Sequence, residues 1–212
     1  MPYYLIPQST YPLIFGIMLR FATFILLIMA IGSCRPPVFP PKPPGYYKID
    51  TPLSHEYRIF TRQGFPYTFE YPVYSTITDD TVFQPKKEPY WININFPGLG
   101  AVINITYKEI SVAHTYIQLM EEADGFSFFH HEKADYIDQF VFNFPDNKVS
   151  GIVYTVGGNA ATRYQFTASD SVKHFMRGAL YFNVTPNADS LKPATDFLLQ
   201  DIHHMLETLQ WR

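Results

Sequence analysis

The chain has 212 residues and a mass of 24.6 kDa, a size that suits one domain or at most two small ones. It is 47% hydrophobic with a net charge of -3, which excludes a disordered chain and argues against nucleic-acid binding, because no basic surplus can neutralise phosphates. The single cysteine excludes a disulfide framework and any metal site built from several cysteines.

The N-terminal residues have the pattern of an export signal. Residues 21–31 are apolar or nearly so, and they follow Arg20, the positive flank that precedes the hydrophobic core of a secretory signal. This apolar run is shorter than the roughly 20 residues that a membrane-spanning helix needs. Met18 is an alternative start of translation and would give a compact, charged leader.

The residues after this apolar core resemble a bacterial lipobox. Residues 31–34 read Ile-Gly-Ser-Cys, which is an aliphatic residue, two small residues and a cysteine. Small residues suit the cleaved bond, and the thiol supplies the sulfur that receives the lipid. We therefore predict a signal peptide over residues 1–33 and a stable membrane attachment through acyl chains on Cys34. The alternative is an uncleaved anchor with an incidental cysteine.

A proline-rich segment follows the cysteine. Residues 35–44 contain six prolines, a density that favours the extended polyproline II conformation. Such a segment spans on the order of 30 Å, at about 3.1 Å per residue. We predict that residues 34–44 form an acylated spacer that holds the following domain away from the bilayer.

Residues 45–212 are predicted to form a single α+β domain. Alternating hydrophobicity and aromatic clusters indicate strands, and Gly-rich turns at 97–100 and 157–159 indicate two hairpins. Residues 133–143 are ambiguous, with a strand slightly favoured. The predicted strands are 57–60, 65–71, 90–96, 101–107, 149–156, 160–166 and 173–184.

Two helices are predicted to cover this antiparallel sheet. The first runs from Ser111 to Ala123 and ends at Asp124-Gly125. Its apolar residues at helical spacing are Val112, Tyr116, Met120 and Ala123. The second is the C-terminal helix, with Ser190 or Asp189 as its cap and Pro193 in its first turn. Its predicted core-facing stripe consists of Ala194, Leu198, Ile202, Met205 and Leu209.

The histidines are the strongest candidates for a metal or catalytic site. His203, His204 and Glu207 lie on the C-terminal helix, and His203 and Glu207 are four residues apart, so they could share a metal ion. The apolar stripe points the opposite way, which predicts a solvated face instead. The run His130-His131-Glu132 lacks the spacing of a zinc motif.

No other motif carries a strong chemical signal. Gly157-Gly158-Asn159 lacks the lysine and hydroxyl residue of a phosphate-binding loop, and the chain has no Gly-x-Ser-x-Gly nucleophile elbow. The only cysteine is assigned to the lipid. The sequence therefore predicts no catalytic residue, no metal site and no cofactor.

Several segments resemble the gliding-motility lipoprotein family GldD. The resemblance extends over nearly all of residues 42–212, and the run Lys-His-Phe-Met-Arg-Gly-Ala-Leu-Tyr-Phe-Asn at 173–183 is its most specific part. It implies a cell-envelope lipoprotein that is required for gliding in bacteria with a type 9 secretion system, and it assigns no catalytic residue. The other matching segments are 44–50, 69–74, 91–97, 131–135, 158–161 and 186–191, with His204, Glu207, Thr208 and Trp211.

A fainter resemblance concerns the fold alone. The order of elements along the chain resembles that of the PsbP/Mog1-like α/β/α sandwich. These elements are the segment Gly64–Pro72, a later hairpin pair and a closing amphipathic helix. This resemblance would not fix a function, because one fold serves many functions.

The sequence and the family resemblance together predict a non-enzymatic assembly or stability factor. Its expected partners are the membrane, through the lipid on Cys34, and other gliding-motility lipoproteins or secretion components, with no nucleic acid. It would face the periplasm, with the outer membrane slightly favoured, and exposed aromatic residues at the sheet edge would supply its contact surface. The alternative is a periplasmic ligand-binding or metal-dependent hydrolytic domain that uses His130, His131, His203 and Glu207.

Overall fold

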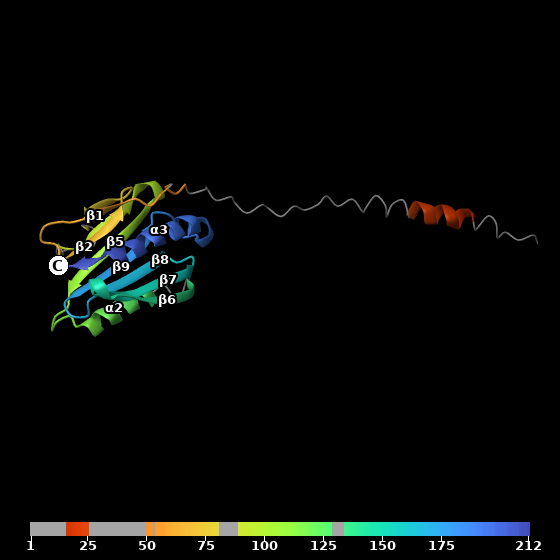
Figure 1. Ribbon diagram of the computed structural model, residues 1–212. Helices are drawn as coiled ribbons and strands as arrows, with labels where there is room; N and C mark the ends of the chain where they lie inside the picture. Colours follow the sequence, from red (N-terminus) through yellow and green to blue (C-terminus); the bar gives the residue numbers. More distant parts are fainter. Residues whose placement is uncertain (1–15, 26–49, 53, 81–88, 129–133) are drawn as a thin grey trace, which may run out of the picture. The chain divides into compact units, whose positions relative to one another are not determined.

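The structure is a computed structural model that describes residues 16–25, 50–52, 54–80, 89–128 and 134–212 (Figure 1). The chain divides into two units, Met1–Gly45 and Tyr46–Arg212. In the first unit, residues 16–25 form a helix. Among the described helices, none has the length and apolar character that crossing a bilayer requires.

Several predictions concern residues outside these ranges. They are the lipidation at Cys34, the spacer over residues 34–44 and the positions of His130 and His131. These remain predictions.

The second unit is α+β, as the sequence predicts. Its elements in chain order are β1 (Tyr57–Phe60), β2 (Tyr67–Pro72), β3 (Thr76–Asp79), β4 (Ile92–Phe96), η1 (Pro97–Leu99), β5 (Ala101–Glu109), α2 (Tyr116–Phe128), β6 (Ala134–Phe144), η3 (Pro145–Asn147), β7 (Val149–Gly158), β8 (Thr162–Ser169), β9 (His174–Phe182), α3 (Ala188–Thr208) and β10 (Gln210–Trp211).

The strands form two antiparallel sheets. The larger has seven strands in the order β3-β4-β5-β9-β8-β7-β6, and the smaller has the order β1-β2-β10. The larger sheet has a helix on each face (Figure 1). Phe175 and Met176 are consecutive in β9 and point to opposite faces; Phe175 packs with residues of α2, and Met176 belongs to the core that includes α3. The predicted α/β/α layering is therefore present.

The first hairpin shows how the sequence pattern sets the faces of the sheet. In β4, Ile92, Ile94 and Phe96 are buried, whereas the two intervening asparagines are half-buried on the opposite face. The chain then turns through η1, and Gly100 has φ = 58°, a left-handed conformation that glycine adopts at little cost. The predicted turn at 97–100 and the pairing of β4 with β5 are confirmed.

The C-terminal helix has the predicted buried stripe but a different cap. Ala194, Leu198, Ile202, Met205 and Leu209 are all buried. The cap is neither Ser190 nor Asp189: α3 begins at Ala188, and the side chain of Asn187 accepts a hydrogen bond from the backbone N–H of Ser190 at 3.0 Å. Ser190 is thus the third residue of the helix and a donor to the cap.

The first predicted helix is shifted along the chain. It begins at Tyr116 and not at Ser111, and it continues through Gly125 to Phe128. Ser111 and His114 form a turn through two backbone hydrogen bonds, at 2.9 and 3.2 Å. Val112, which the helical spacing placed on the apolar stripe, is 99% exposed.

Two short strands have no counterpart among the predicted elements, and one ambiguous segment is resolved. The missing strands are β3 and β10, with four and two residues. The ambiguous residues 133–143 correspond to β6, an eleven-residue strand at one edge of the larger sheet. The main core lies between the two sheets and α3 and contains residues from both sheets and the helix.

Candidate functional site

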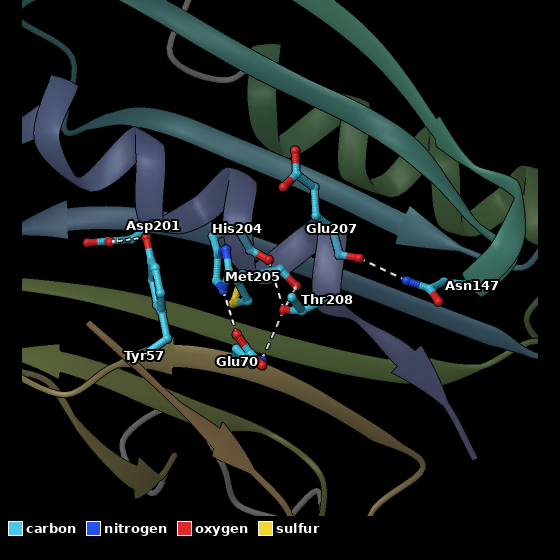
Figure 2. Close-up of polar contacts among 8 residues, drawn as sticks. All are labelled: Tyr57, Glu70, Asn147, Asp201, His204, Met205, Glu207 and Thr208. Atoms are coloured by element: carbon cyan, nitrogen blue, oxygen red, sulfur yellow. Dashed lines mark hydrogen bonds and ion pairs between the residues drawn. The ribbon is translucent and has the colours of Figure 1, made fainter. Parts of the chain in front are cut away.

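The polar residues of α3 that are the strongest candidates for a metal site form no metal-binding group among the described residues. His203 and Glu207 are both exposed, as the helical wheel predicts. Figure 2 shows the Glu207 carboxyl group pointing away from His204, and the Glu207 backbone carbonyl accepts a hydrogen bond from Asn147 Nδ2 at 2.8 Å. Within the described ranges, no group of three or more His, Cys, Asp or Glu residues is placed to hold a metal ion.

His204 instead connects α3 to the smaller sheet. Its Nε2 lies 2.6 Å from Glu70 Oε2 on β2, and its ring stacks on Tyr57 of β1 with the centroids 3.7 Å apart (Figure 2). The backbone N–H of Glu70 also donates to Thr208 Oγ1 at 3.0 Å. These contacts fix the helix against the sheet, because each joins a side chain of α3 to β1 or β2.

Asp201 is a buried acidic residue of α3. The residue is only 2% exposed, and its carboxyl group has three neighbours from the N-terminal part of the domain. His55 Nδ1 lies 2.7 Å away, the Tyr57 hydroxyl donates at 3.1 Å, and the Tyr74 hydroxyl donates to the other carboxyl oxygen. We refer to Asp201, His55, Tyr57 and Tyr74 as the Asp201 cluster.

The tyrosines of the Asp201 cluster are suited to donate protons in hydrogen bonds and unsuited to act as bases. Burial raises the pKa of Tyr57 far above its ordinary value, and the charge of Asp201 raises it further. Burial and the hydrogen bond to Asp201 raise the pKa of Tyr74 in the same direction. Both hydroxyls stay protonated at neutral pH, so the cluster acts as a structural connection between α3 and the strands.

One signal for this cluster is visible in the sequence: an acidic residue within the apolar stripe of α3. Asp201 lies next to Ile202 and three residues after Leu198, so a carboxyl group sits within the buried stripe. A buried carboxyl group needs hydrogen-bond partners. Its partners come from positions about 130 to 150 residues earlier in the chain, and no local pattern identifies them.

A second group of polar residues surrounds a hollow of about 460 Å³ near the start of β9. His174 is buried there, its Nδ1 lies 2.8 Å from the Tyr107 hydroxyl, and its ring stacks on Trp211 with the centroids 5.1 Å apart. Charged residues that line the hollow are Asp146, Lys148, Asp170 and Arg212.

Asp170 organises the turn that leads into β9. Its Oδ1 accepts the backbone N–H groups of Val172, Lys173 and His174 at 3.0, 2.8 and 2.8 Å. Burial alone would raise the pKa of Asp170, but these three donors outweigh burial and lower the pKa. The carboxylate therefore acts as a cap for the turn.

His174 predicts a pH dependence of stability. Burial lowers the pKa of His174 below its ordinary value of 6.5. As the pH falls, the imidazole is therefore protonated in the unfolded chain before it is protonated in the folded chain, and protonation favours unfolding. The contribution is fully present above about pH 6.5 and is lost as the pH falls below it. We expect the unfolding midpoint to fall between about pH 6.5 and pH 5 in the wild type and to fall less in His174→Gln. The exposed His203→Gln is the matched control; the prediction fails if both variants keep the wild-type profile.

The outer strand of the larger sheet has an apolar edge. Only β7 pairs with β6 among the described strands. Phe140 is 64% exposed and Val141 is 70% exposed, and because they are adjacent in a strand they point to opposite faces. Tyr136 is 47% exposed and covers Gly157, where its ring leaves no room for a Cβ atom. We call Tyr136, Phe140 and Val141 with the free side of β6 the β6 edge.

Comparisons with known proteins identify the family. Cyanobacterial PsbP (CyanoP) from Synechocystis sp. PCC 6803, a solution structure, is similar at 10% sequence identity with a TM-score of 0.47, over 75% of this chain and 94% of that one. The search of curated proteins gave no significant match. A family model described as "Gliding motility lipoprotein GldD" matches residues 37–211, which include every strand of both sheets, α2 and α3. The chain therefore belongs to the GldD family of gliding motility lipoproteins.

Proposed function

We propose that this gliding motility lipoprotein is a non-enzymatic factor that assembles or stabilises other proteins of the gliding and type 9 secretion machinery. It is acylated at Cys34 after removal of residues 1–33 and faces the periplasm. Residues 34–44 are the spacer, and residues 45–212 are the binding domain. The outer membrane is the preferred location.

The β6 edge carries this proposal. An eleven-residue outer strand offers backbone N–H and C=O groups to an added strand, and Phe140 and Val141 offer apolar contacts on both of its faces. Natural proteins normally protect such an edge with charges, a proline or a covering segment. The exposed charges of β6, Asp135 and Asp138, lie in its first half, and residues 139–144 carry none. An exposed apolar edge in a folded domain is consistent with a partner that adds an extended segment there.

The histidines and acidic residues described so far support a binding protein over an enzyme. The Asp201 cluster and the His204–Glu70 pair form hydrogen bonds that hold α3 on the smaller sheet. His203 and Glu207 are exposed, and no described group of three or more His, Cys, Asp or Glu residues is placed to hold a metal ion. A hydrolytic role at His203 and Glu207 would predict lost gliding in the His203→Ala/Glu207→Ala variant, whereas the assembly role predicts a nearly silent change.

A charged β6 edge tests the proposal directly. We expect Phe140→Lys/Val141→Lys to abolish colony spreading and to lower the amount of at least one other gliding lipoprotein severalfold, because lysine on an edge strand blocks strand addition. The matched control is Val172→Lys, a position in the turn before β9 that is 77% exposed. Spreading and immunoblots of the same cells are the measurements, and the variant itself must be present at its normal level.

Deletion of the gene separates the two parts of the proposal. If spreading fails and a partner lipoprotein disappears, the chain stabilises an assembly. If spreading fails while every partner keeps its normal level, the assembly role is wrong, and normal spreading contradicts the gliding role itself. Cys34→Ser is expected to release the protein from the membrane fraction and to reproduce the deletion.

A further inference from the structure

A groove of about 790 Å³ lies on the face of the larger sheet that α2 covers in part. Strands β4, β5 and β9 form its floor, and residues of α2 form one wall. The volume falls within the range of about 300–1,000 Å³ that small-molecule sites occupy. It is separate from the Asp201 cluster and from the β6 edge, and neither His203 nor Glu207 lines it.

Charged side chains of both signs line the groove. Lys108 Nζ on β5 lies 2.9 Å from Glu122 Oε2 on α2, so these two opposite charges pair across one side of the groove. Arg177 donates to Gln165 Oε1 at 2.6 Å, and its guanidinium group lies 4.9 Å from the ring centre of Phe126. Asp80 is the fourth charged residue of the lining, so two acidic and two basic side chains balance, and a groove with no net formal charge suits a neutral ligand.

Carboxamide side chains dominate the polar part of the floor. Asn93 and Asn104 are directly opposite each other on β4 and β5, and Asn104 Nδ2 donates to Asn93 Oδ1 at 2.6 Å. Each carboxamide has an NH2 group that donates and a carbonyl oxygen that accepts. The bond between the two side chains therefore leaves Asn93 Nδ2 as a donor and Asn104 Oδ1 as an acceptor for a ligand. Asn95 and Asn183 also line the groove. Amides arranged in this way match hydroxyl groups, because a hydroxyl both donates and accepts.

Aromatic rings supply the apolar part. Trp91, Phe126, Phe175 and Tyr181 all line the groove. The indole N–H of Trp91 donates to the Tyr107 carbonyl oxygen at 2.9 Å, which fixes the orientation of the ring. Rings of this kind pack against the C–H faces of a sugar ring, whose hydroxyls point sideways to polar partners. The groove thus combines the two surfaces that such an amphipathic ring requires.

We propose that this groove binds a neutral oligosaccharide built of pyranose rings, with Asn93 and Asn104 hydrogen-bonding to its hydroxyls and Trp91 packing against a ring face. An extended peptide is the less favoured occupant. Sheets bind peptides by adding a strand at a free edge, whereas the floor here is a sheet face whose backbone groups pair with neighbouring strands. A carbohydrate site goes beyond the assembly function, which the β6 edge carries independently.

The test uses the full chain in a detergent without a sugar head group. The protein has two tryptophans, so Trp211→Phe leaves Trp91 as the only tryptophan, and excitation at a wavelength that tyrosine does not absorb reports on the groove alone. Maltotetraose, cellotetraose and chitotetraose are titrated to about 10 mM, beside an uncharged capped hexapeptide. We expect a saturable change in Trp91 fluorescence with at least one of the three sugars and none with the peptide.

Paired variants assign the binding to the groove. Asn93→Leu/Asn104→Leu is expected to weaken sugar binding at least about tenfold, as expected for the loss of two ordinary hydrogen bonds. Asn143→Leu is the matched control, because this asparagine is exposed on β6 outside the groove. Isothermal titration calorimetry repeats the comparison with both tryptophans present. The proposal is overturned if no sugar binds, if the peptide binds instead, or if the double variant binds as tightly as Asn143→Leu at an unchanged unfolding midpoint.

Discussion

Replacing Gly151 by alanine is expected to lower the free energy of unfolding by at least about 3 kcal/mol, which corresponds to a fall of about 6–12 °C in the unfolding midpoint. A Cβ atom at this position in β7 would lie 1.9 Å from the backbone carbonyl oxygen of Thr167 in β8 and 2.9 Å from the ring of Phe142. A backbone oxygen cannot rotate away as a flexible side chain can. Strands β7 and β8 would have to separate, and the hydrogen bonds between them would weaken.

Gly125→Ala is the matched control for this prediction. Gly125 lies inside α2, and a Cβ atom there meets nothing within 4 Å. Alanine favours a helix interior over glycine by about 0.5–1 kcal/mol, so this variant should be slightly more stable than the wild type. Thermal and urea unfolding of both variants measure the difference. Equal midpoints for the two variants would contradict the close strand packing at Gly151.

The second large effect is expected at Asp201. Asp201→Ala should cost about 3 kcal/mol or more, because it removes the group that accepts hydrogen bonds from Tyr57 and Tyr74 and leaves these donors, with His55, partly buried and without that partner. Asp201→Asn keeps one carbonyl oxygen and is expected to fall between alanine and the wild type. Unfolding in urea at neutral pH measures the three proteins on one scale.

An acidic residue on the same helix provides the control. Asp196 pairs with Lys192 at the surface, four residues apart, and both side chains are well exposed. Asp196→Ala should change stability by less than about 1 kcal/mol, since surface ion pairs of this kind contribute little. A loss at Asp201 no larger than the loss at Asp196 would mean that the Asp201 cluster does not hold α3 on the sheet.

Local patterns in the sequence predict much of this fold. The alternation in β4 assigns Ile92, Ile94 and Phe96 to the buried face, and the structure confirms it. The stripe from Ala194 to Leu209 is likewise buried. Such patterns suffice because each residue's burial follows from its own periodicity, so no distant partner is needed to assign the face.

The start of α2 shows a local signal that was present and was missed. Thr115 and Gln118 form a capping box: the backbone N–H of Thr115 donates to Gln118 Oε1 at 3.0 Å, and the backbone N–H of Gln118 donates to Thr115 Oγ1 at 3.4 Å. The spacing Thr-x-x-Gln is visible in the sequence. The helical spacing of apolar residues that begins at Val112 favours an earlier start, so the predicted helix begins at Ser111 and the observed helix at Tyr116.

Other features depend on contacts that no local pattern contains. β10 has two residues and exists only because it pairs with β2, and the partners of Asp201 come from the opposite end of the domain. The groove lined by Asn93 and Asn104 is similar, because it becomes a site only when β9 and α2 are placed around the hairpin. The sequence predicts which face those asparagines occupy but not what surrounds them.

The smaller sheet joins segments from opposite ends of the domain, and this sets an order of folding. β2 lies between β1 and β10, α3 packs on it, and the Arg212 backbone N–H donates to the Pro66 carbonyl at 2.8 Å. Contacts across so many residues carry a large loop-closure entropy and form slowly. In a chain that emerges N-terminus first, β1 and β2 therefore lack their C-terminal partners, and Phe60 and Phe69 stay partly uncovered, until α3 and β10 are available. The larger sheet contains neither α3 nor β10, so its seven strands can pair before the smaller sheet is complete.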